Sequence, residues 1–193
     1  MAALRSIAEA LPLNRAKDKP VEAQDEMTFL RGVSIFKGLS DGQIRKVRER
    51  MTKKTFEAGT PIIREGEVDA DNVMYILEEG TVEISKTVTL KVSSTDFGQK
   101  EKSFIRLTGA MRPFFGEMSM LEENTERSAT VAALDRCATL IITKKDFEAL
   151  AAEDPVIGYV VVTNISRVLA DRLRKTNNDV LKLTTALSLA LSR

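Results

Sequence analysis

Residues 115–130 are the stretch from which the fold can be inferred, and they read Phe115-Gly116-Glu117-Met118-Ser119-Met120-Leu121-Glu122-Glu123-Asn124-Thr125-Glu126-Arg127-Ser128-Ala129-Thr130. A glycine and an acidic residue stand at the start of a predicted short helix, and an arginine follows about ten residues later at the head of a predicted strand. The first N–H groups of a helix carry the positive end of its dipole and attract anions. Gly116 has no side chain, so a ligand can approach the backbone closely. The stretch therefore predicts an anion site.

Arg127 and Glu117 extend this anion site to a phosphate and a sugar. An arginine guanidinium is a planar, permanently charged group that matches phosphate oxygens. A carboxylate in the same place would repel phosphate, so Glu117 is expected to serve another group, such as a sugar hydroxyl. In the alternative interpretation the two residues form an ordinary surface ion pair near a turn. The accompanying Gly116, Ser128 and Ala129 favour the binding interpretation.

The stretch resembles the phosphate-binding cassette of cyclic nucleotide-binding domains, in which F-G-E-[LMI]-[AS]-x-[LI] is followed by a variable turn and R-[STA]-A-[TSW]. Residues 56–66 and 74–84 resemble the early roll strands of that family, and residues 30–40 resemble its entry helices. The similarity covers residues 27–150 and continues into the C-terminal helix. It implies an α+β fold: an antiparallel β-roll, a jelly-roll-like double-stranded β-helix, flanked by N-terminal helices and a long C-terminal helix.

The resemblance also implies a ligand, cAMP or cGMP without a metal, and a set of contacts. Glu117 would accept a hydrogen bond from the ribose 2′-hydroxyl, and Arg127 would pair with the exocyclic phosphate oxygens. Backbone N–H groups and one hydroxyl would complete the phosphate shell, from Gly116, Met118, Ala129 and Ser128. One departure from the family pattern is the segment 110–114, which stands where a glycine and an acidic residue usually precede F-G-E. The strand that leads into the cassette is therefore expected to enter differently.

Residues 172–177 resemble the region where catabolite-activator-type regulators place hydroxyl side chains against the adenine amine. Thr176 and Asn177 are therefore candidate base contacts. The alternative is that Thr176, as a polar residue in an apolar seam, only sets the register of a helix pair. Ser128 can serve either nucleotide, and we favour cAMP over cGMP.

The C-terminal segment also predicts a dimer. No proline or glycine interrupts residues 159–193, and the apolar positions step by four and three, as in a heptad seam. The seam consists of Ile165, Leu169, Leu173, Thr176, Val180, Leu183, Leu187 and Ala190. Because such a long helix extends past one domain, a second copy of the helix is its expected cover, and a homodimer is predicted. The alternative is a helix that folds back on its own roll.

Helical periodicity is also predicted in front of the roll. The predicted helices cover residues 1–11, residues 26–36 with Gly32 as an interruption, and the residues after a cap at Ser40. The polar residues 14–24 suggest a tether. The strands begin at Thr52, and a helix at 144–152 follows them.

Within the roll, short segments rich in Val, Ile, Thr and Phe alternate with glycines. Segments 81–85 and 88–93 are two of the predicted strands, and residues 87–107 are expected to form a long projecting hairpin. Three parts are predicted along the chain: an N-terminal helix and tether, the cyclic nucleotide-binding domain, and a long helix for dimerisation and base capping, over residues 1–26, 27–154 and 155–193.

Composition excludes several function classes. The 193 residues include 29 Lys+Arg and 28 Asp+Glu, one Cys and no His. Without histidine, catalytic triads and most zinc sites are ruled out, and no other catalytic motif is present, so we expect no enzyme. The net charge of +1 provides no field for nucleic acid or membranes. The basic residues 45–54 lack aromatic neighbours and are expected to be the outer face of a helix.

Cys137 lies in an apolar run and is predicted to be buried; a single cysteine fits a reducing compartment, so a cytoplasmic protein is expected. The predicted function is a cyclic nucleotide sensor that signals to an unidentified effector protein through its C-terminal helix. The alternative is a scaffold with the same fold that no longer responds to nucleotide. Direct DNA binding is not expected, because no helix-turn-helix follows the long helix in this sequence.

Overall fold

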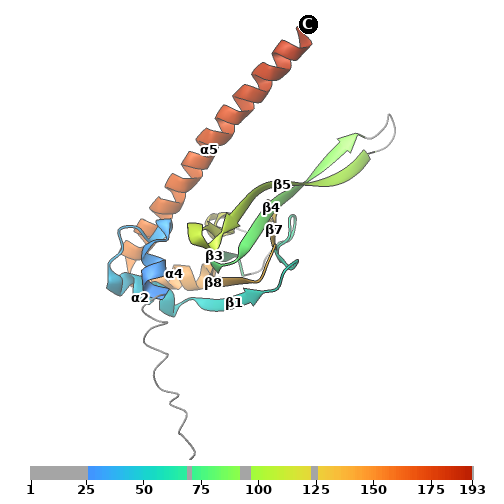
Figure 1. Ribbon diagram of the computed structural model, residues 1–193. Helices are drawn as coiled ribbons and strands as arrows, with labels where there is room; N and C mark the ends of the chain where they lie inside the picture. Colours follow the sequence, from blue (N-terminus) through green and yellow to red (C-terminus); the bar gives the residue numbers. More distant parts are fainter. Residues whose placement is uncertain (1–25, 69–70, 92–96, 123–125, 193) are drawn as a thin grey trace, which may run out of the picture.

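The computed structural model describes residues 26–68, 71–91, 97–122 and 126–192, with side chains described outside 88–104. The predicted helix over residues 1–11 and the tether at 14–24 lie outside the described residues. Helices gather at one end of a β-roll, and one long helix and one hairpin project from it (Figure 1).

Two antiparallel sheets form the roll, with strand orders β1-β8-β3-β6 and β2-β7-β4-β5. The first sheet consists of β1 (Thr52–Phe56), β3 (Val73–Glu79), β6 (Phe114–Phe115) and β8 (Cys137–Thr143). The second consists of β2 (Pro61–Ile63), β4 (Thr81–Lys91), β5 (Phe97–Thr108) and β7 (Thr130–Ala133). Because β7 and β8 follow one another in the chain but lie in different sheets, they connect the two layers. The predicted α+β fold with an antiparallel roll is confirmed.

The hairpin of β4 and β5 is longer than predicted. β4 and β5 pair from Thr81↔Thr108 to Lys91↔Phe97. The pairing of β4 with β7 is shorter and covers only Val82–Ser85 of β4. The hairpin therefore leaves the roll as a ribbon of two strands, as Figure 1 shows. The two strands predicted at 81–85 and 88–93 are one strand, because Lys86 and Thr87 between them are not turn residues.

The helices follow local sequence chemistry. Ser40 caps α2 (Asp41–Glu49) as predicted: its Oγ accepts a hydrogen bond from the N–H of Gln43 at 3.3 Å, and the Gln43 Oε1 accepts one from the N–H of Ser40 at 3.0 Å. The segment 26–36 is not one helix. Residues 26–31 are helical, Gly32 lies in a turn, and a 3₁₀ turn η1 (Ser34–Phe36) follows.

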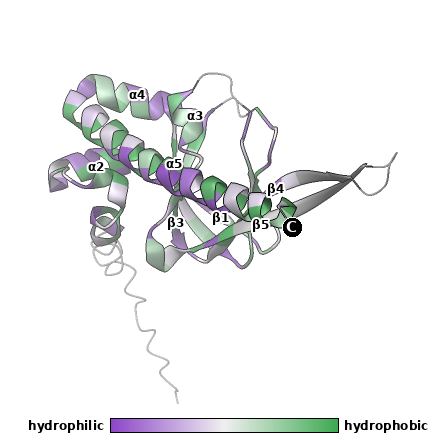
Figure 2. Cartoon of the chain, turned by 90° about the horizontal axis from the view of Figure 1, so that it is seen from above, coloured by the Kyte–Doolittle hydropathy of each residue, from purple (hydrophilic) through white to green (hydrophobic). Residues whose placement is uncertain are grey.

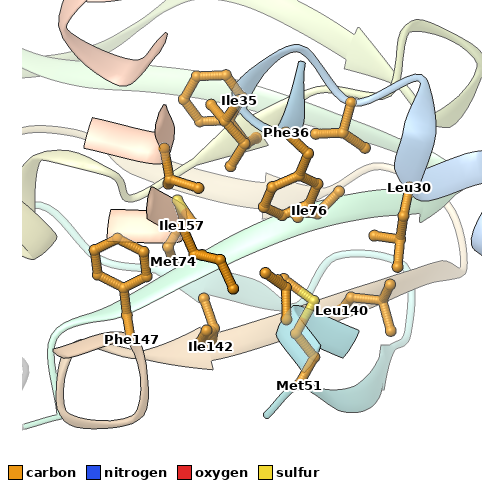
Figure 3. Packing of buried hydrophobic residues seen from close by; sticks show 14 of the residues in the cluster. Leu30, Ile35, Phe36, Met51, Met74, Ile76, Leu140, Ile142, Phe147 and Ile157 are labelled. Carbon is orange, nitrogen blue, oxygen red and sulfur yellow. The ribbon is translucent and has the colours of Figure 1, made fainter. Parts of the chain in front are cut away.

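The larger hydrophobic cluster lies between the helices and the first sheet. Figure 3 shows Ile76 and Leu140 of that sheet facing Leu30, Ile35 and Ile157 of the helical layer. α4 (Lys144–Glu153) and the start of α5 (Pro155–Leu191) belong to this layer. A smaller cluster lies inside the roll and contains Cys137, which is fully buried as predicted.

The first half of α5 is buried along one face, and its second half is exposed. Ile165 was predicted in the heptad seam but is 1 % exposed, because α5 packs there against η1 and α4. Asn164 fixes this contact, since its Nδ2 donates hydrogen bonds to the carbonyls of Ile35 at 3.0 Å and Lys37 at 2.8 Å. Residues 173–192 are all exposed, so this part of the helix does not fold back on the roll.

The basic stretch 45–54 is divided between two elements. α2 ends at Glu49 and β1 begins at Thr52, so the single helix face that we predicted is wrong beyond Glu49. Four of its basic residues form ion pairs with carboxylates: Lys46 with Asp154, Arg48 with Glu26, Arg50 with Glu153 and Lys53 with Glu78. Within the described part of the chain, none of the helices combines the length and the apolar character that a membrane crossing needs.

Candidate functional site

Gly116 determines the backbone conformation at the start of the site. It follows β6 directly and has a φ of 78°, a conformation that other residues rarely adopt. A Cβ at this position would lie 2.8 Å from the carbonyl oxygen of Val73, so a side chain has no room here. Glu117 comes next as the N-cap of the short helix α3 (Met118–Leu121). Glycine, acid and short helix occur in the predicted order.

The side chain of Arg127 is fixed in place by the protein itself. Its Nη1 donates to the Ser119 Oγ at 2.8 Å and to the carbonyl of Gly116 at 3.3 Å, and its Nη2 donates to the carbonyl of Val73 at 3.0 Å. The Ser119 Oγ in turn donates to the Gly116 carbonyl at 2.9 Å. The guanidinium is therefore oriented without help from a ligand, which lowers the entropy cost of binding an anion.

Glu117 forms an ion pair with the long helix. Its Oε1 accepts a hydrogen bond from Nη1 of Arg172 at 2.5 Å, and the Arg172 guanidinium lies 5.6 Å from the ring centre of Phe114. Glu117 is 4 % exposed and Arg127 is 7 % exposed. A surface ion pair between Glu117 and Arg127 therefore does not fit, since both side chains are buried.

One pocket of about 180 Å³ brings together the six residues predicted to contact the phosphate and the ribose. Its wall contains Gly116, Glu117, Met118, Arg127, Ser128 and Ala129. Apolar side chains complete the wall, among them Ile63, Ile84, Phe115 and Val131. Among the described residues, no cluster of Cys, Asp or Glu side chains is arranged to hold a metal ion.

The two candidate base contacts lie farther away. Thr176 and Asn177 are exposed on α5, about one helical turn beyond Arg172, and they are not among the residues that line the pocket. Their role stays a prediction. Arg172 itself was not predicted as a site residue, although it stands in the segment 172–177 that resembles the base-covering helix. The four-residue spacing to Thr176, which places both on nearly the same helix face, was the available signal.

Comparison with known proteins identifies the family. Residues 53–154 match the family described as "Cyclic nucleotide-binding domain". This match, together with the roll and the cassette, shows that the chain belongs to the cyclic nucleotide-binding domain family, a family of ligand-binding regulatory domains.

Two curated relatives are longer proteins than this chain. The cyclic AMP receptor protein of Thermus thermophilus is 27 % identical over 146 residues, which is 76 % of this chain and 60 % of that protein. The human cGMP-dependent protein kinase 2 is 26 % identical over 178 residues, which is 90 % of this chain and 22 % of that protein. The chain thus spans between about a fifth and three fifths of the length of these curated relatives.

Solved structures agree with the fold. The catabolite activator protein of Thermus thermophilus superposes with a TM-score of 0.65 at 25 % identity, over 78 % of this chain and 63 % of that one. The regulatory domain of Toxoplasma gondii PKA, crystallised with cAMP, gives a TM-score of 0.60 at 26 % identity, over 80 % of this chain and 52 % of that one.

Proposed function

We propose that this chain is a cyclic nucleotide sensor, which prefers cAMP to cGMP and transmits the occupancy of its pocket through α5. The observation that carries the proposal is the hydrogen bond between Glu117 and Arg172. The carboxylate expected to accept the ribose hydroxyl is held by a residue of the helix expected to respond. Ligand site and output helix therefore meet at one contact.

The pocket suits the three parts of a cyclic nucleotide. The phosphate would face Arg127, the Ser128 hydroxyl and the backbone N–H groups of Gly116, Met118 and Ala129. The ribose would donate a hydrogen bond to Glu117. The base would lie against the apolar wall that includes Ile84 and Val131 and extend toward Thr176 and Asn177.

Binding would change the contact of α5 with the cassette. A pocket for a whole small ligand usually measures roughly 300–1,000 Å³, more than the present cavity. A ribose on Glu117 would compete with Arg172, and movement of Arg172 would enlarge the pocket. The ligand would thus favour a state with a different α5 contact, and this difference in affinity between two states is what a sensor needs.

The exposed half of α5 is the proposed output. It carries the seam residues from Leu173 to Ala190, which would associate with the same helix of a second copy. The dimer or its change on ligand binding would then be read by an effector protein. The alternative function is a scaffold that keeps this fold and uses protein contacts alone.

Thermal unfolding with cAMP, cGMP and linear 5′-AMP tests the proposal. A ligand at about 100 times its dissociation constant adds roughly 2.7 kcal/mol, which raises the Tm of a domain this size by roughly 5–10 °C. We expect the largest rise with cAMP, a smaller one with cGMP and none with 5′-AMP. Arg127→Lys should lose most of the rise, because lysine keeps the charge but not the planar group. No rise with either cyclic nucleotide would favour the scaffold.

A further inference from the structure

The linker between β5 and β6 contacts the helical segment that precedes η1. The guanidinium carbon of Arg112 lies 5.9 Å from the ring centre of Phe29, within the range of a cation–π contact. The same side chain covers Gly32 so closely that a Cβ at residue 32 would lie 1.7 Å from the Arg112 Nη1 and 2.8 Å from its Cδ. The Arg112 side chain therefore packs directly on Gly32, and the absence of a Cβ there makes this contact possible.

The backbone of this linker is held in an unusual conformation. Arg112 ends the short 3₁₀ turn η2 (Gly109–Met111) with a φ of 48° and a ψ of 49°, the left-handed region that side chains other than glycine rarely adopt. Such a conformation persists where surrounding contacts determine it. Gly109 at the other end is confined as well, since a Cβ there would lie 2.3 Å from the carbonyl oxygen of Glu78.

The linker leads directly into the cassette, and the strand between them is weakly anchored to the sheet. β6 pairs with β3 at Tyr75↔Phe115 and Ile76↔Phe114, and the carbonyl of Pro113 accepts a hydrogen bond from the N–H of Leu77 at 3.0 Å. So short a strand depends on side-chain contacts for its position. Arg112 provides one such contact on the helical side, one residue before Pro113.

We propose that Arg112 is a positioning residue that couples residues 26–32 to the cassette, through the contacts of its side chain with Gly32 and Phe29. The coupling rests on the proposed function, since it concerns how the helical segment affects nucleotide binding at Glu117. Movement of the helical segment shifts β6, and ligand binding, which orders the cassette, stabilises the helical segment in return. This mutual effect follows from linkage between the two sites.

Gly32→Ala is the most direct probe, because the three atoms nearest to its methyl group, Nη1, Cζ and Cδ, all belong to the Arg112 side chain. The matched control is Gly42→Ala in α2, where a Cβ meets nothing within 4 Å. Amide hydrogen exchange of the ligand-free full chain is measured at residues 114–118. We expect faster exchange in Gly32→Ala and Arg112→Met, and unchanged exchange in Gly42→Ala. Arg112→Lys, which keeps a cation near Phe29, should restore part of the protection.

Calorimetric titration with cAMP tests the connection to the site. Gly32→Ala and Arg112→Met should bind about two- to fivefold more weakly, the range that a partly exposed cation–π contact allows. Faster exchange with unchanged affinity would overturn the coupling to the site. Equal exchange at residues 114–118 in Gly32→Ala and Gly42→Ala would overturn the positioning role itself. If the unmodified chain binds neither cyclic nucleotide, the proposed function fails, while the exchange comparison still decides the role of Arg112.

Discussion

At the scale of single residues, Gly116 has the most restricted backbone position of the site. Gly116 and Gly59 have the same φ of 78°, but only at Gly116 would a Cβ meet a neighbour, the Val73 carbonyl at 2.8 Å. Gly59→Ala should therefore cost only the left-handed backbone term of about 1–2 kcal/mol. Gly116→Ala adds a steric clash and should cost about 2–4 kcal/mol in total. Urea unfolding of both variants measures the difference, and equal losses would contradict the close approach.

The contact between Glu117 and Arg172 is a second residue-scale test. Arg172 is half-exposed, so its pairing with the buried Glu117 is partly screened by water. A double-mutant cycle of Glu117→Gln and Arg172→Met in the ligand-free protein should give a coupling free energy of about 1 kcal/mol. A control cycle of Glu117→Gln with Arg174→Met should show additive effects, because Arg174 pairs with Asp171 instead. Additivity in both cycles would remove the basis for competition between ribose and Arg172.

Local motifs could predict the cassette residues, but not the residue that covers them. Gly116 to Ala129 lie close together in the sequence, so one motif places all of them. Arg172 is 55 residues from Glu117, and their contact depends on how α5 crosses the roll. The role of Gly32 depends similarly on a distant side chain, that of Arg112. Periodicity predicts that a helix exists, not which side chain it brings over a pocket.

At the scale of elements, Asp154 joins three helices. It lies between α4 and α5, and its carboxylate accepts hydrogen bonds from the Lys46 Nζ at 3.1 Å and the Gln43 Nε2 at 3.5 Å, both from α2. The hydrogen bond from Lys46 lowers the pKa of Asp154 below its ordinary value of 3.8. A carboxyl with a lowered pKa in the folded state stabilises the protein above its unfolded pKa, and this contribution is lost as the pH falls through the folded value.

Urea unfolding midpoints measured between pH 7 and pH 3 test this junction, because that interval includes the ordinary pKa of an aspartate, about 3.9. Asp154→Asn should be less stable than the unmodified protein at pH 7, and the difference should shrink as the pH falls below the ordinary value. Lys46→Met should flatten the same part of the profile, because it removes the main cause of the shift. A difference that stays constant over this range would show that the charge of Asp154 does not hold α2 to the junction.

Elements were predictable where local chemistry determines them. The Ser40 cap was predicted because capping is a local effect. The helical segment predicted over residues 26–36 ends earlier, at Gly32, which the sequence marked only as a weak point within it. The assignment of Ile165 to the seam failed for a physical reason: a step of four residues satisfies both a heptad seam and a core-facing helix stripe. Only the packing of α5 against η1 decides between them.

At the scale of the whole molecule, the exposed half of α5 determines how copies associate. Figure 2 shows hydrophobic residues recurring along this helix, and Leu173, Val180, Leu183 and Leu187 of the seam are 56–71 % exposed. Covering these four side chains on two helices would contribute roughly 10 kcal/mol. Association costs roughly 4–15 kcal/mol. At the lower end of this cost, about 6 kcal/mol remains, which corresponds to a dissociation constant of tens of micromolar. We therefore expect a dimer that is populated at tens of micromolar and dissociates on dilution.

Two pairs of aspartate substitutions can assign the dimer to one helix face. Val180→Asp with Leu187→Asp places charges in the seam and should give a monomer in sedimentation equilibrium. Leu181→Asp with Leu189→Asp introduces the same charges on residues that are 66 % and 67 % exposed but lie outside the seam, and this variant should remain a dimer. Since both variants change a projecting part of the helix, neither should alter the Tm of a monomeric roll. If the unmodified chain is a monomer at every concentration, with or without cAMP, the dimer is contradicted, and the exposed half of α5 would instead contact an effector protein. If both variants are monomers, the helix associates through more than the heptad seam.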